Sequence, residues 1–484
     1  MNIAAIATAP GTGGIAVIRL SGPGAFTITD RIFRARNRNK TVSTAEAYTM
    51  LFGNIVDEIT DNRVQSTDNQ TNSSLLTPHS SFLIDEVVIS IFRAPHSFTG
   101  ENTVEISCHG SIYIQQEILR LLIAAGARMA GPGEFTQRAF LNGRLDLSQA
   151  EAVADLINAQ SAAAHTIALN QMRGNFSSKL EELRRQLLHF VSLLELELDF
   201  GDHDDLEFAD RTELNSVAQE IQSQLTRLQQ SFSQGNAIKN GIPVAIVGET
   251  NAGKSTLLNL LVGDNRAIVS DIHGTTRDVI EDTVNINGLT FRFIDTAGIR
   301  QTSDIIENLG IERTYEMISR AQIILWVVDS TNVTEHIEWL AERIMRRSED
   351  KRLIILLNKI DRLNDEELIT LRQWFEPFNA TTVEISAKKA LNTEQLTQLL
   401  YESAQMPDIT GSDIIISNLR HYEALTHALD SIDRVIEGLQ ANIPADFVAQ
   451  DIREALFHLA EITGGEITTD EVLGNIFAHF CIGK

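Results

Sequence analysis

Residues 248–255 of the 484-residue chain read GETNAGKS and match the phosphate-binding pattern G-x-x-x-x-G-K-[ST] in full. In this pattern, glycines allow backbone N–H groups to surround a β-phosphate, a lysine places its charge between the β- and γ-phosphates, and a hydroxyl ligates Mg²⁺. The run VAIV before the motif predicts a strand and the run STLLNLL after it predicts a helix, which is the context that this chemistry requires. We expect the nucleotide to contact Asn251, Ala252, Gly253, Lys254, Ser255 and Thr256.

Three short motifs follow in chain order, each at the end of an apolar, strand-like run. The DTAG motif at 295–298 can hold Mg²⁺ through water and sense the γ-phosphate through a backbone N–H. The NKID motif at 358–361 offers a carboxylate that accepts hydrogen bonds from guanine N1–H and the 2-amino group, and the SAK motif at 386–388 can donate to guanine O6. Together they predict a GTP site that includes Asp295, Thr296, Ala297, Gly298, Asn358, Lys359, Ile360, Asp361, Ser386, Ala387 and Lys388.

Hydrolysis requires a group that orients the attacking water. Ras-type enzymes use a glutamine directly after the glycine of the DxxG motif, and this chain has Ile299 there. Either hydrolysis is slow or another side chain does this work; Glu307 is a carboxylate in the following segment, which also contains Arg300. From residue type alone, a solvated helix position is the favoured interpretation of Glu307. We interpret residues 270–276 as the switch segment, in which Thr276 completes the Mg²⁺ shell when GTP is bound.

Length and composition limit the classes of protein that can carry these motifs. A chain of 484 residues, 43% hydrophobic and 22% charged, suits about two to four globular domains. The formal charge of −25 is uneven, because residues 1–144 hold 12 basic and 12 acidic side chains whereas residues 145–484 hold 28 basic and 53 acidic. This excludes a generally basic protein that coats nucleic acid, but it leaves room for a local basic site.

Cysteine usage and hydropathy indicate the compartment. Two cysteines, Cys108 and Cys481, cannot form a disulfide framework, which fits a reducing environment. The N-terminus lacks the charged and apolar regions of a secretory signal, and no run approaches the ~20 apolar residues of a membrane span. We therefore expect a cytoplasmic protein.

Hydrophobic periodicity in the N-terminal third predicts a mixture of strands and helices. Strands are predicted at Gly14–Leu20 and Glu86–Phe92, and a helix is predicted at Ser111–Ala125. Residues 57–81 are rich in Asn, Ser, Thr and Asp, and they predict a polar loop insertion at the surface.

The hydrophobic pattern of the remaining chain changes twice. Residues 145–241 predict long amphipathic helices, interrupted by a solvated acidic loop at 199–210. Residues 242–405 alternate Val/Ile/Leu-rich strands with helices, which is typical of a parallel sheet in a doubly wound α/β fold. Residues 406–484 are helical again, so that the two helical blocks predict one helical domain into which the α/β domain is inserted.

Longer stretches outside the nucleotide motifs carry a family resemblance. They are APGTGGIAVIRLSG at 9–22, HSFTGENTVEISCHG at 96–110, GPGEFTQRAFLNGRLDLSQAEAVADLI at 131–157 and the final residues CIGK, and they accompany GTTRD, DTAGIR, NKID and SAK. This combination, over essentially the whole chain, resembles the MnmE (TrmE) family of tRNA modification GTPases. The resemblance implies a multidomain α/β plus all-α protein with an N-terminal α+β folate-binding and dimerisation domain at 1–144, a helical domain at 145–241 and 406–484, and a Ras-like P-loop GTPase domain at 242–405.

The resemblance also implies a reaction. Members of the family are homodimers that form a heterotetramer with the FAD-dependent protein MnmG (GidA). They modify the wobble uridine of certain tRNAs at C5, giving aminomethyl or carboxymethylaminomethyl derivatives, and hydrolyse GTP to GDP and phosphate as a conformational switch. A 5-formyltetrahydrofolate or related tetrahydrofolate is held in the N-terminal domain, and the matching contacts are Arg19, Glu105, Arg144 and Lys484. For Cys481, a catalytic role and a buried small hydrophobe are equally open.

Catalysis in the family depends on K⁺, which implies roles for further residues. Asn251 is the side-chain ligand of the ion, and Ser270, Ile272 and Thr275 lie on the loop that closes over it when two G domains meet. The cation acts where an arginine finger acts in other GTPases, because it neutralises charge in the transition state. Glu307 matches the water-orienting glutamate of the family, which reverses the interpretation from residue type alone.

These roles complete the set of expected site residues. The expected catalytic residues are Glu307, Lys254 and Asp295. Mg²⁺ is expected on Ser255 and Thr276. Within the switch segment, the expected nucleotide and ion contacts are Ser270, Asp271, Ile272, His273, Gly274, Thr275 and Thr276.

Two other functions remain in competition with tRNA modification. The nucleotide motifs alone fit a GTPase that times ribosome or RNA assembly equally well, and the folate-binding stretches distinguish the two. A folate-dependent transferase with a vestigial G domain is disfavoured, because Lys254, Asp295 and Asp361 are all intact.

Overall fold

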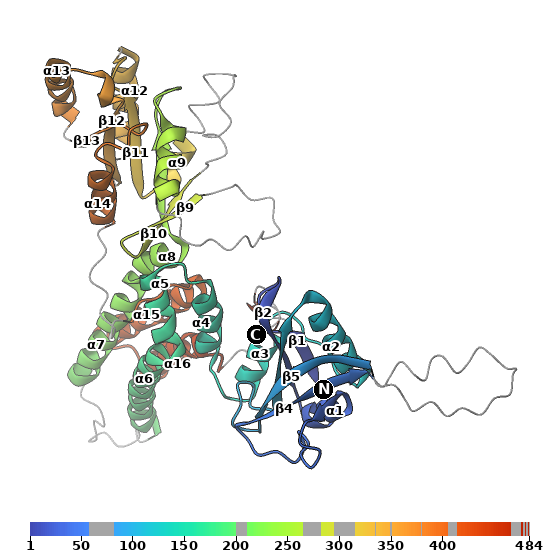
Figure 1. The fold of residues 1–484 in the computed structure, drawn as a ribbon. Coiled ribbons are helices and arrows are strands. Elements are labelled where there is room, and N and C mark those ends of the chain that lie inside the picture. Colours follow the sequence, from blue (N-terminus) through green and yellow to red (C-terminus); the bar gives the residue numbers. More distant parts are fainter. Residues whose placement is uncertain are drawn as a thin grey trace, which may run out of the picture. The chain divides into compact units, whose positions relative to one another are not determined.

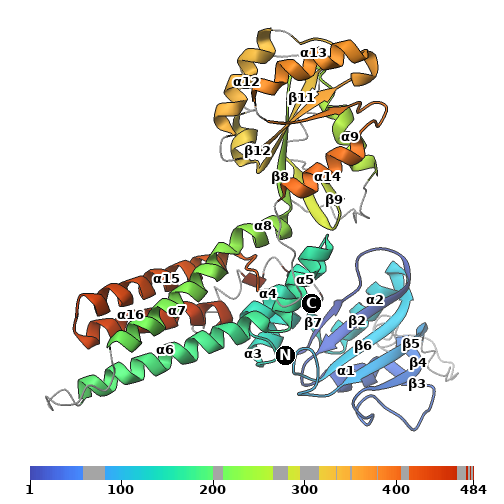
Figure 2. The same ribbon diagram turned by 90° about the vertical axis from the view of Figure 1, so that its left-hand side faces the viewer.

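The computed structural model describes residues 1–57, 82–199, 211–264, 282–294, 315–333, 335–348, 351–378, 380–404 and 414–465, together with residues 476, 477, 480 and 483. The chain forms two compact units (Figures 1 and 2). The first unit contains residues 1–154, 172–181 and 459–484, and the second contains residues 155–171 and 182–458.

A seven-stranded sheet forms the centre of the first unit (Figure 2). Its strands are β1 (Ile3–Ile6), β2 (Gly13–Ser21), β3 (Phe33–Ala35), β4 (Thr49–Asp57), β5 (Phe82–Phe92), β6 (Thr103–Gly110) and β7 (Arg128–Met129). They lie in the order β3-β4-β5-β6-β2-β1-β7, and every neighbouring pair is antiparallel except β1 and β7.

Alternating burial along the strands explains why helices cover one face of this sheet. In β5, Val87, Ile89 and Ile91 are buried, whereas the residues between them are exposed or half-buried. The helices α1 (Ala25–Ile32) and α2 (Ile112–Ala124) complete this core, and α3 (Glu134–Leu141) follows β7. The predicted strands and helix are confirmed, although β5 begins at Phe82 rather than Glu86.

The end of the chain belongs to the first unit. Phe477 is buried against α4 (Leu147–Asn158). Gly133 leaves room for this segment, since a Cβ there would lie 2.8 Å from the Cβ of Phe480. A Cβ on Gly483 would lie 2.5 Å from the carbonyl oxygen of Ile6, at the end of β1. The described part of the C-terminal segment therefore packs against β1 and the start of α3.

A helical bundle forms part of the second unit. Its helices include α7 (Arg211–Gln230), α8 (Phe232–Asn240) and α15 (Leu419–Gln440), with α6 (Asn175–Asp199) from residue 182 and α16 (Ala445–Thr463) up to residue 458. Helix α5 (Ala162–Met172) precedes them. Helix α7 packs along α15, with Gln222 donating to Asp433 at 2.6 Å and Gln229 donating to Thr426 at 2.9 Å. Segments from both sides of residues 242–405 thus pack together, while the domain boundaries stay a prediction.

A six-stranded sheet forms the rest of the second unit. Its strands are β8 (Ile242–Val247), β9 (Asp282–Ile286), β10 (Leu289–Phe293), β11 (Ile323–Asp329), β12 (Arg352–Asn358) and β13 (Thr381–Ile385), in the order β13-β12-β11-β8-β10-β9. All but β9 run parallel. Helices α9 (Lys254–Asp264) and α14 (Thr393–Ser403) cover one face, and α12 (Glu335–Arg347) and α13 (Asp365–Phe375) cover the other. The predicted doubly wound fold is confirmed.

The edge strand β9 is a strand that the periodicity analysis missed. It pairs antiparallel with β10 through a turn at Asn287 and Gly288, whose φ angles are 51° and 83°. An Asn-Gly pair between short alternating runs is a strong hairpin signal, and the sequence NINGLT contains it. The parallel sheet therefore has one antiparallel edge.

Two predicted loops cannot be compared with the structure. The polar insertion at 57–81 and the acidic loop at 199–210 lie, apart from their first residues, outside the described residues. Among the helices that are described, none combines the length and the hydropathy that crossing a bilayer requires.

Candidate functional site

The loop between β8 and α9 has the conformation of a phosphate-binding loop. Gly248 and Gly253 have φ angles of 145° and 105°, and Asn251 has a φ of 63°. A Cβ on Gly248 would lie 2.1 Å from the carbonyl oxygen of Val327, so only glycine fits there. The strand–loop–helix context predicted for residues 248–255 is present, and the loop opens at the carboxyl end of β8.

Lys254 closes over this loop. Its Nζ donates to the carbonyl oxygens of Gly248 and Glu249, each at 2.7 Å. Burial lowers the pKa of Lys254, and the nearby charge of Glu249 opposes this shift. A bound phosphate would compensate the same burial more fully, so the ammonium is placed to move from carbonyls to phosphate oxygens. Ser255 is half-buried at the start of α9, and Thr256 is exposed.

Asn358 joins three of the predicted motifs. Its Nδ2 donates to the carbonyl oxygen of Ala252 at 2.7 Å, and its Oδ1 accepts from the backbone N–H of Ala387 at 3.0 Å. The side chain is 3% exposed. A Cβ on Gly253 would lie 2.1 Å from Nδ2 of Asn358, which explains the second glycine of the loop. The structure therefore brings the phosphate loop, the NKID motif and the SAK motif together through one side chain.

Asp361 is held ready to accept hydrogen bonds. The hydroxyl of Ser386 donates to its Oδ1 at 2.7 Å, and Nζ of Lys389 lies 3.7 Å from its Oδ2. The hydrogen bond from Ser386 and the charge of Lys389 hold the pKa of Asp361 below its ordinary value. An ionised carboxylate at this place suits the two N–H donors of guanine. Ile360 and Lys388 lie in the adjoining turns.

Lys359 has a partner that the sequence analysis did not identify. It adopts a φ of 69° and forms an ion pair with Asp329 at the end of β11. Burial alone would raise the pKa of Asp329, but the hydrogen bonds from Lys359 and Thr331 hold it below the ordinary value. The signal that could have found Asp329 is its place at the end of the apolar run IILWVVD, at the same sheet edge as the nucleotide motifs.

The remaining predicted nucleotide and ion residues lie outside the described residues. They comprise the switch segment, the DTAG motif and the hydrolytic candidates, that is Ser270, Asp271, Ile272, His273, Gly274, Thr275, Thr276, Asp295, Thr296, Ala297, Gly298, Ile299, Arg300 and Glu307. Their roles stay predictions.

A second group of predicted residues lies in the first unit. Arg19 on β2 and Glu105 on β6 are paired in register, and Nε and Nη2 of the arginine donate to Oε1 of the glutamate at 2.9 and 2.7 Å. The guanidinium lies 5.6 Å from the ring centres of both Phe98 and Phe135, and its Nη1 donates to the carbonyl oxygen of Gly483 at 3.4 Å. Two of the four predicted folate contacts are thus adjacent, next to the C-terminal segment.

The other two predicted folate contacts are Arg144 and Lys484. Arg144 is exposed and packs its Cγ near Gly100, where a Cβ would lie 3.2 Å away. Lys484 and Cys481 lie outside the described residues. Among the described residues, Oε2 of Glu105 has no hydrogen-bond partner, so one carboxylate oxygen is available to a ligand that donates N–H groups.

An ionic chain supports the same region and was not foreseen. Arg138 bridges Glu101 at 2.9 Å and Glu134 at 3.0 Å, and Arg128 donates to Glu134 at 2.7 Å. Burial would raise the pKa of Glu134, but the hydrogen bonds from Arg128, Gly131 and Arg138 lower it to about 2. This chain ties the start of α3 to the loop before β6. Spacing in the sequence could not reveal it, because its members come from separate segments.

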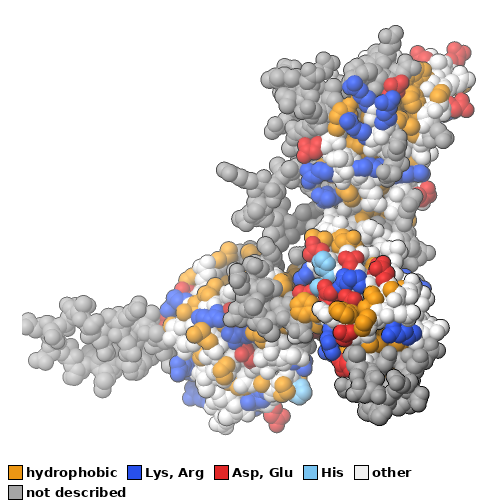
Figure 3. All heavy atoms as spheres, turned by 180° about the vertical axis from the view of Figure 1, so that it is seen from behind, with side chains coloured by type: hydrophobic (Ala, Val, Ile, Leu, Met, Phe, Trp, Pro, Cys, Tyr) orange, Lys and Arg blue, Asp and Glu red, His pale blue; other side chains and the backbone are white. Residues whose placement is uncertain are grey.

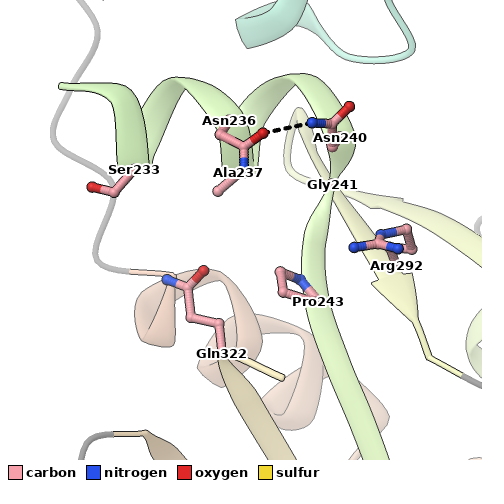
Figure 4. A pocket seen from close by; sticks show the side chains of 8 residues that line it. All are labelled: Ser233, Asn236, Ala237, Asn240, Gly241, Pro243, Arg292 and Gln322. Carbon is pink, nitrogen blue, oxygen red and sulfur yellow. Dashed lines mark hydrogen bonds between the residues drawn. The ribbon is translucent and has the colours of Figure 1, made fainter. Parts of the chain in front are cut away.

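A cavity of about 410 Å³ lies away from these groups, at the amino ends of β8 and β11 (Figure 4). Nδ2 of Asn240 donates to Oδ1 of Asn236 at 2.6 Å on its α8 wall. The nucleotide motifs lie at the opposite, carboxyl ends of the strands, so this cavity is separate from the nucleotide site. Its lining is Ser233, Asn236, Ala237, Asn240, Gly241, Pro243, Arg292 and Gln322.

Comparison with known proteins identifies the family of this chain. A model described as "GTP-binding protein TrmE N-terminus" matches residues 2–144, and a model described as "MnmE helical domain" matches residues 147–481. The chain belongs to the MnmE family. A tRNA modification GTPase MnmE of Parabacteroides distasonis is 57% identical over 483 residues, with 100% of both chains covered.

Other MnmE relatives agree over the same length. Those of Bacteroides fragilis and Christiangramia forsetii are 55% and 49% identical, over 100% of this chain and 99% of theirs. The resemblance found in the sequence is confirmed, and the MnmE assignment covers both the nucleotide motifs and the paired Arg19 and Glu105.

Proposed function

We propose that this MnmE-family GTPase hydrolyses GTP to GDP and phosphate as a conformational switch in the modification of the tRNA wobble uridine at C5. An aminomethyl or carboxymethylaminomethyl group is added together with the FAD-dependent protein MnmG. The observation that carries the GTPase part is the side chain of Asn358, which links the phosphate loop to the guanine-recognition motifs. The tRNA part is supported by the match to MnmE relatives over the whole chain.

The chain's own residues account for nucleotide binding. Lys254 would neutralise the phosphates, and Asp361 would accept from guanine. Ser255 and Thr276, with Asp295 through water, would hold Mg²⁺, which supplies charge neutralisation on the phosphates. The fit of Ser255 rests on its place at the start of α9, directly after the loop that surrounds the phosphates.

The proposed K⁺ site has one described ligand. Asn251 is exposed at the turn of the phosphate loop, so that its side chain can reach an ion at the surface of the domain. Ser270, Ile272 and Thr275 would close over the ion, and Glu307 would orient water. Single-turnover hydrolysis should proceed in K⁺ and be slow in Na⁺, because the ion must fit a fixed ring of oxygens; equal rates would contradict the site.

The proposed folate site is built on Arg19 and Glu105. The pair leaves Oε2 of Glu105 open to the N–H donors of a pterin, and Arg144 and Lys484 would meet the anionic glutamate tail. Calorimetry with 5-formyltetrahydrofolate should show binding to the full chain and loss of binding for Glu105→Gln. Equal heats for the two proteins would contradict this assignment.

The proposed assembly is a cytoplasmic homodimer that forms a heterotetramer with MnmG and acts on tRNA. Mass spectrometry of tRNA nucleosides from a deletion strain should show loss of the C5-modified wobble uridine. An unchanged nucleoside profile together with accumulated ribosome precursors would favour the alternative, a GTPase that times ribosome or RNA assembly.

A further inference from the structure

A basic run lies at the free edge of the first unit's sheet. Five of the 12 basic side chains of residues 1–144 fall within residues 31–40, and residues 31–45 contain no acidic side chain. The run covers the end of α1, the edge strand β3 and the turn that follows, a segment that we call the β3 edge. All five of its cations are exposed, namely Arg31, Arg34, Arg36, Arg38 and Lys40.

Three cations of the β3 edge, Arg36, Arg38 and Lys40, have no ion-pair partner among the described residues. Asp30, the preceding acidic residue, accepts a hydrogen bond from the backbone N–H of Val42 at 2.7 Å and so fastens the following loop. Among the described residues, no carboxylate forms an ion pair with Arg36, Arg38 or Lys40. Within the described part of the chain, these three exposed cations therefore have no fixed counter-charge.

Exposed apolar side chains of β4 border the β3 edge. The backbone N–H of Arg36 donates to the carbonyl oxygen of Phe52 at 2.9 Å, and its guanidinium carbon lies 5.9 Å from the centre of the Phe52 ring. Phe52 is 43% exposed, and Met50, two residues earlier on the same side of β4, is 72% exposed. Arginine beside an exposed aromatic ring is the combination with which proteins hold a nucleotide backbone and stack an unpaired base.

The rest of the chain is acidic overall, which disfavours a polyanion there. Residues 145–484 carry 28 basic and 53 acidic side chains, and Figure 3 shows acidic side chains gathered over the helical bundle. At physiological salt, attraction is confined to about 8 Å from the cations. We propose that the β3 edge is the surface on which the phosphodiester backbone of tRNA docks, with Phe52 placed to stack on an unpaired base. This rests on the proposed function and adds to it where the RNA is held.

The test compares the full-length wild type with the triple variant Arg36→Gln, Arg38→Gln, Lys40→Gln. Binding of fluorescently labelled total tRNA is measured by fluorescence anisotropy at several salt concentrations. Loss of three phosphate contacts should reduce the slope of log affinity against log salt by roughly 2–3. The ratio of the two affinities then changes by roughly 15–60-fold between 50 and 200 mM salt, so the variant should bind at least ~15-fold more weakly at 50 mM.

A matched variant removes three exposed cations from the second unit, by Arg227→Gln, Arg320→Gln and Arg346→Gln. It should bind tRNA with the affinity and salt slope of the wild type. Both variants should keep the wild-type GTPase rate and oligomeric state, which shows that they fold. Phe52→Ala should weaken binding without a change in slope, since the ring carries no charge.

Several results would overturn the docking surface. They are an unchanged tRNA affinity and slope in the β3-edge variant, an equal loss in the matched variant, an absence of tRNA binding by the wild type at 50 mM salt, or binding of phosphatidylglycerol vesicles in place of tRNA. The proposed function is tested separately by the nucleoside profile of a deletion strain. If the deletion removes the modified uridine while the β3-edge variant restores it and binds tRNA normally, the function stands and the docking surface fails.

Discussion

Asn358→Ala tests whether one side chain assembles the nucleotide site. The substitution deletes both hydrogen bonds that join Ala252 and Ala387 through this residue, at 2.7 and 3.0 Å. Because the position is 3% exposed, water cannot readily replace them. Leaving two buried backbone groups unsatisfied costs about 1–3 kcal/mol each. We expect a total of about 2–6 kcal/mol, divided between the stability of the second unit and the alignment of its loops.

Nucleotide affinity measures the part of this free-energy cost that falls on loop alignment, and urea unfolding measures the part that falls on stability. A fluorescent GDP analogue should bind at least ~10-fold more weakly to Asn358→Ala, since about 1.4 kcal/mol of the total corresponds to tenfold. Urea unfolding should account for the remainder. Asn285→Ala is the matched control, because it also removes two asparagine hydrogen bonds, to the carbonyl oxygen of Gln160 and from the N–H of Gly288, each at 3.1 Å, at the hairpin between β9 and β10. Affinity within twofold of the wild type for Asn358→Ala would refute the reasoning.

Three further predictions concern single side chains. Gly253→Ala should weaken GDP binding more than ~10-fold, because its Cβ would lie 2.1 Å from the amide of Asn358 at a φ of 105°; normal binding would show that the loop adapts. Asp361→Asn should lose GTP affinity and gain affinity for xanthosine triphosphate, whose carbonyl at position 2 accepts from the new amide; competition binding checks this. Glu134→Gln should cost about 1–2 kcal/mol of unfolding free energy at pH 7 after screening by solvent. The folded pKa of Glu134, about 2, lies below its ordinary value of 4.5. The carboxylate therefore stabilises the fold above that value, and the difference should shrink as the pH falls from 4.5 towards 2; an equal difference at pH 7 and pH 3 would contradict it.

Much of the fold could be predicted from the sequence because its continuous apolar runs and its helical hydrophobic periods are regular. The Val/Ile/Leu runs that became β8, β11 and β12 are buried on both faces, and a parallel sheet is what such runs form. The edge strand β9 was missed because it is only five residues long, although Val284 and Ile286 alternate with polar residues and an Asn-Gly turn follows.

The site was predictable where a motif fixes local geometry and not where distant segments meet. The types and spacing of Lys254 and Asp361 follow from the ligand, and the structure places both at the carboxyl ends of the strands. The ion pair of Asp329 with Lys359 and the ionic chain through Arg138 join segments that only the folded chain brings together. No local spacing encodes such contacts, because tertiary packing decides them.

The most direct test of the central claim couples hydrolysis to modification in cells. A deletion strain is complemented with the wild type or with Glu307→Ala, and the tRNA nucleosides are measured by mass spectrometry, with GTP binding and single-turnover hydrolysis measured on the purified proteins. We predict that the wild type restores the C5-modified wobble uridine, and that the variant binds GTP, hydrolyses it poorly and fails to restore the modification. Full restoration by a variant that does not hydrolyse GTP, or an unmodified profile with the wild type, would contradict the account.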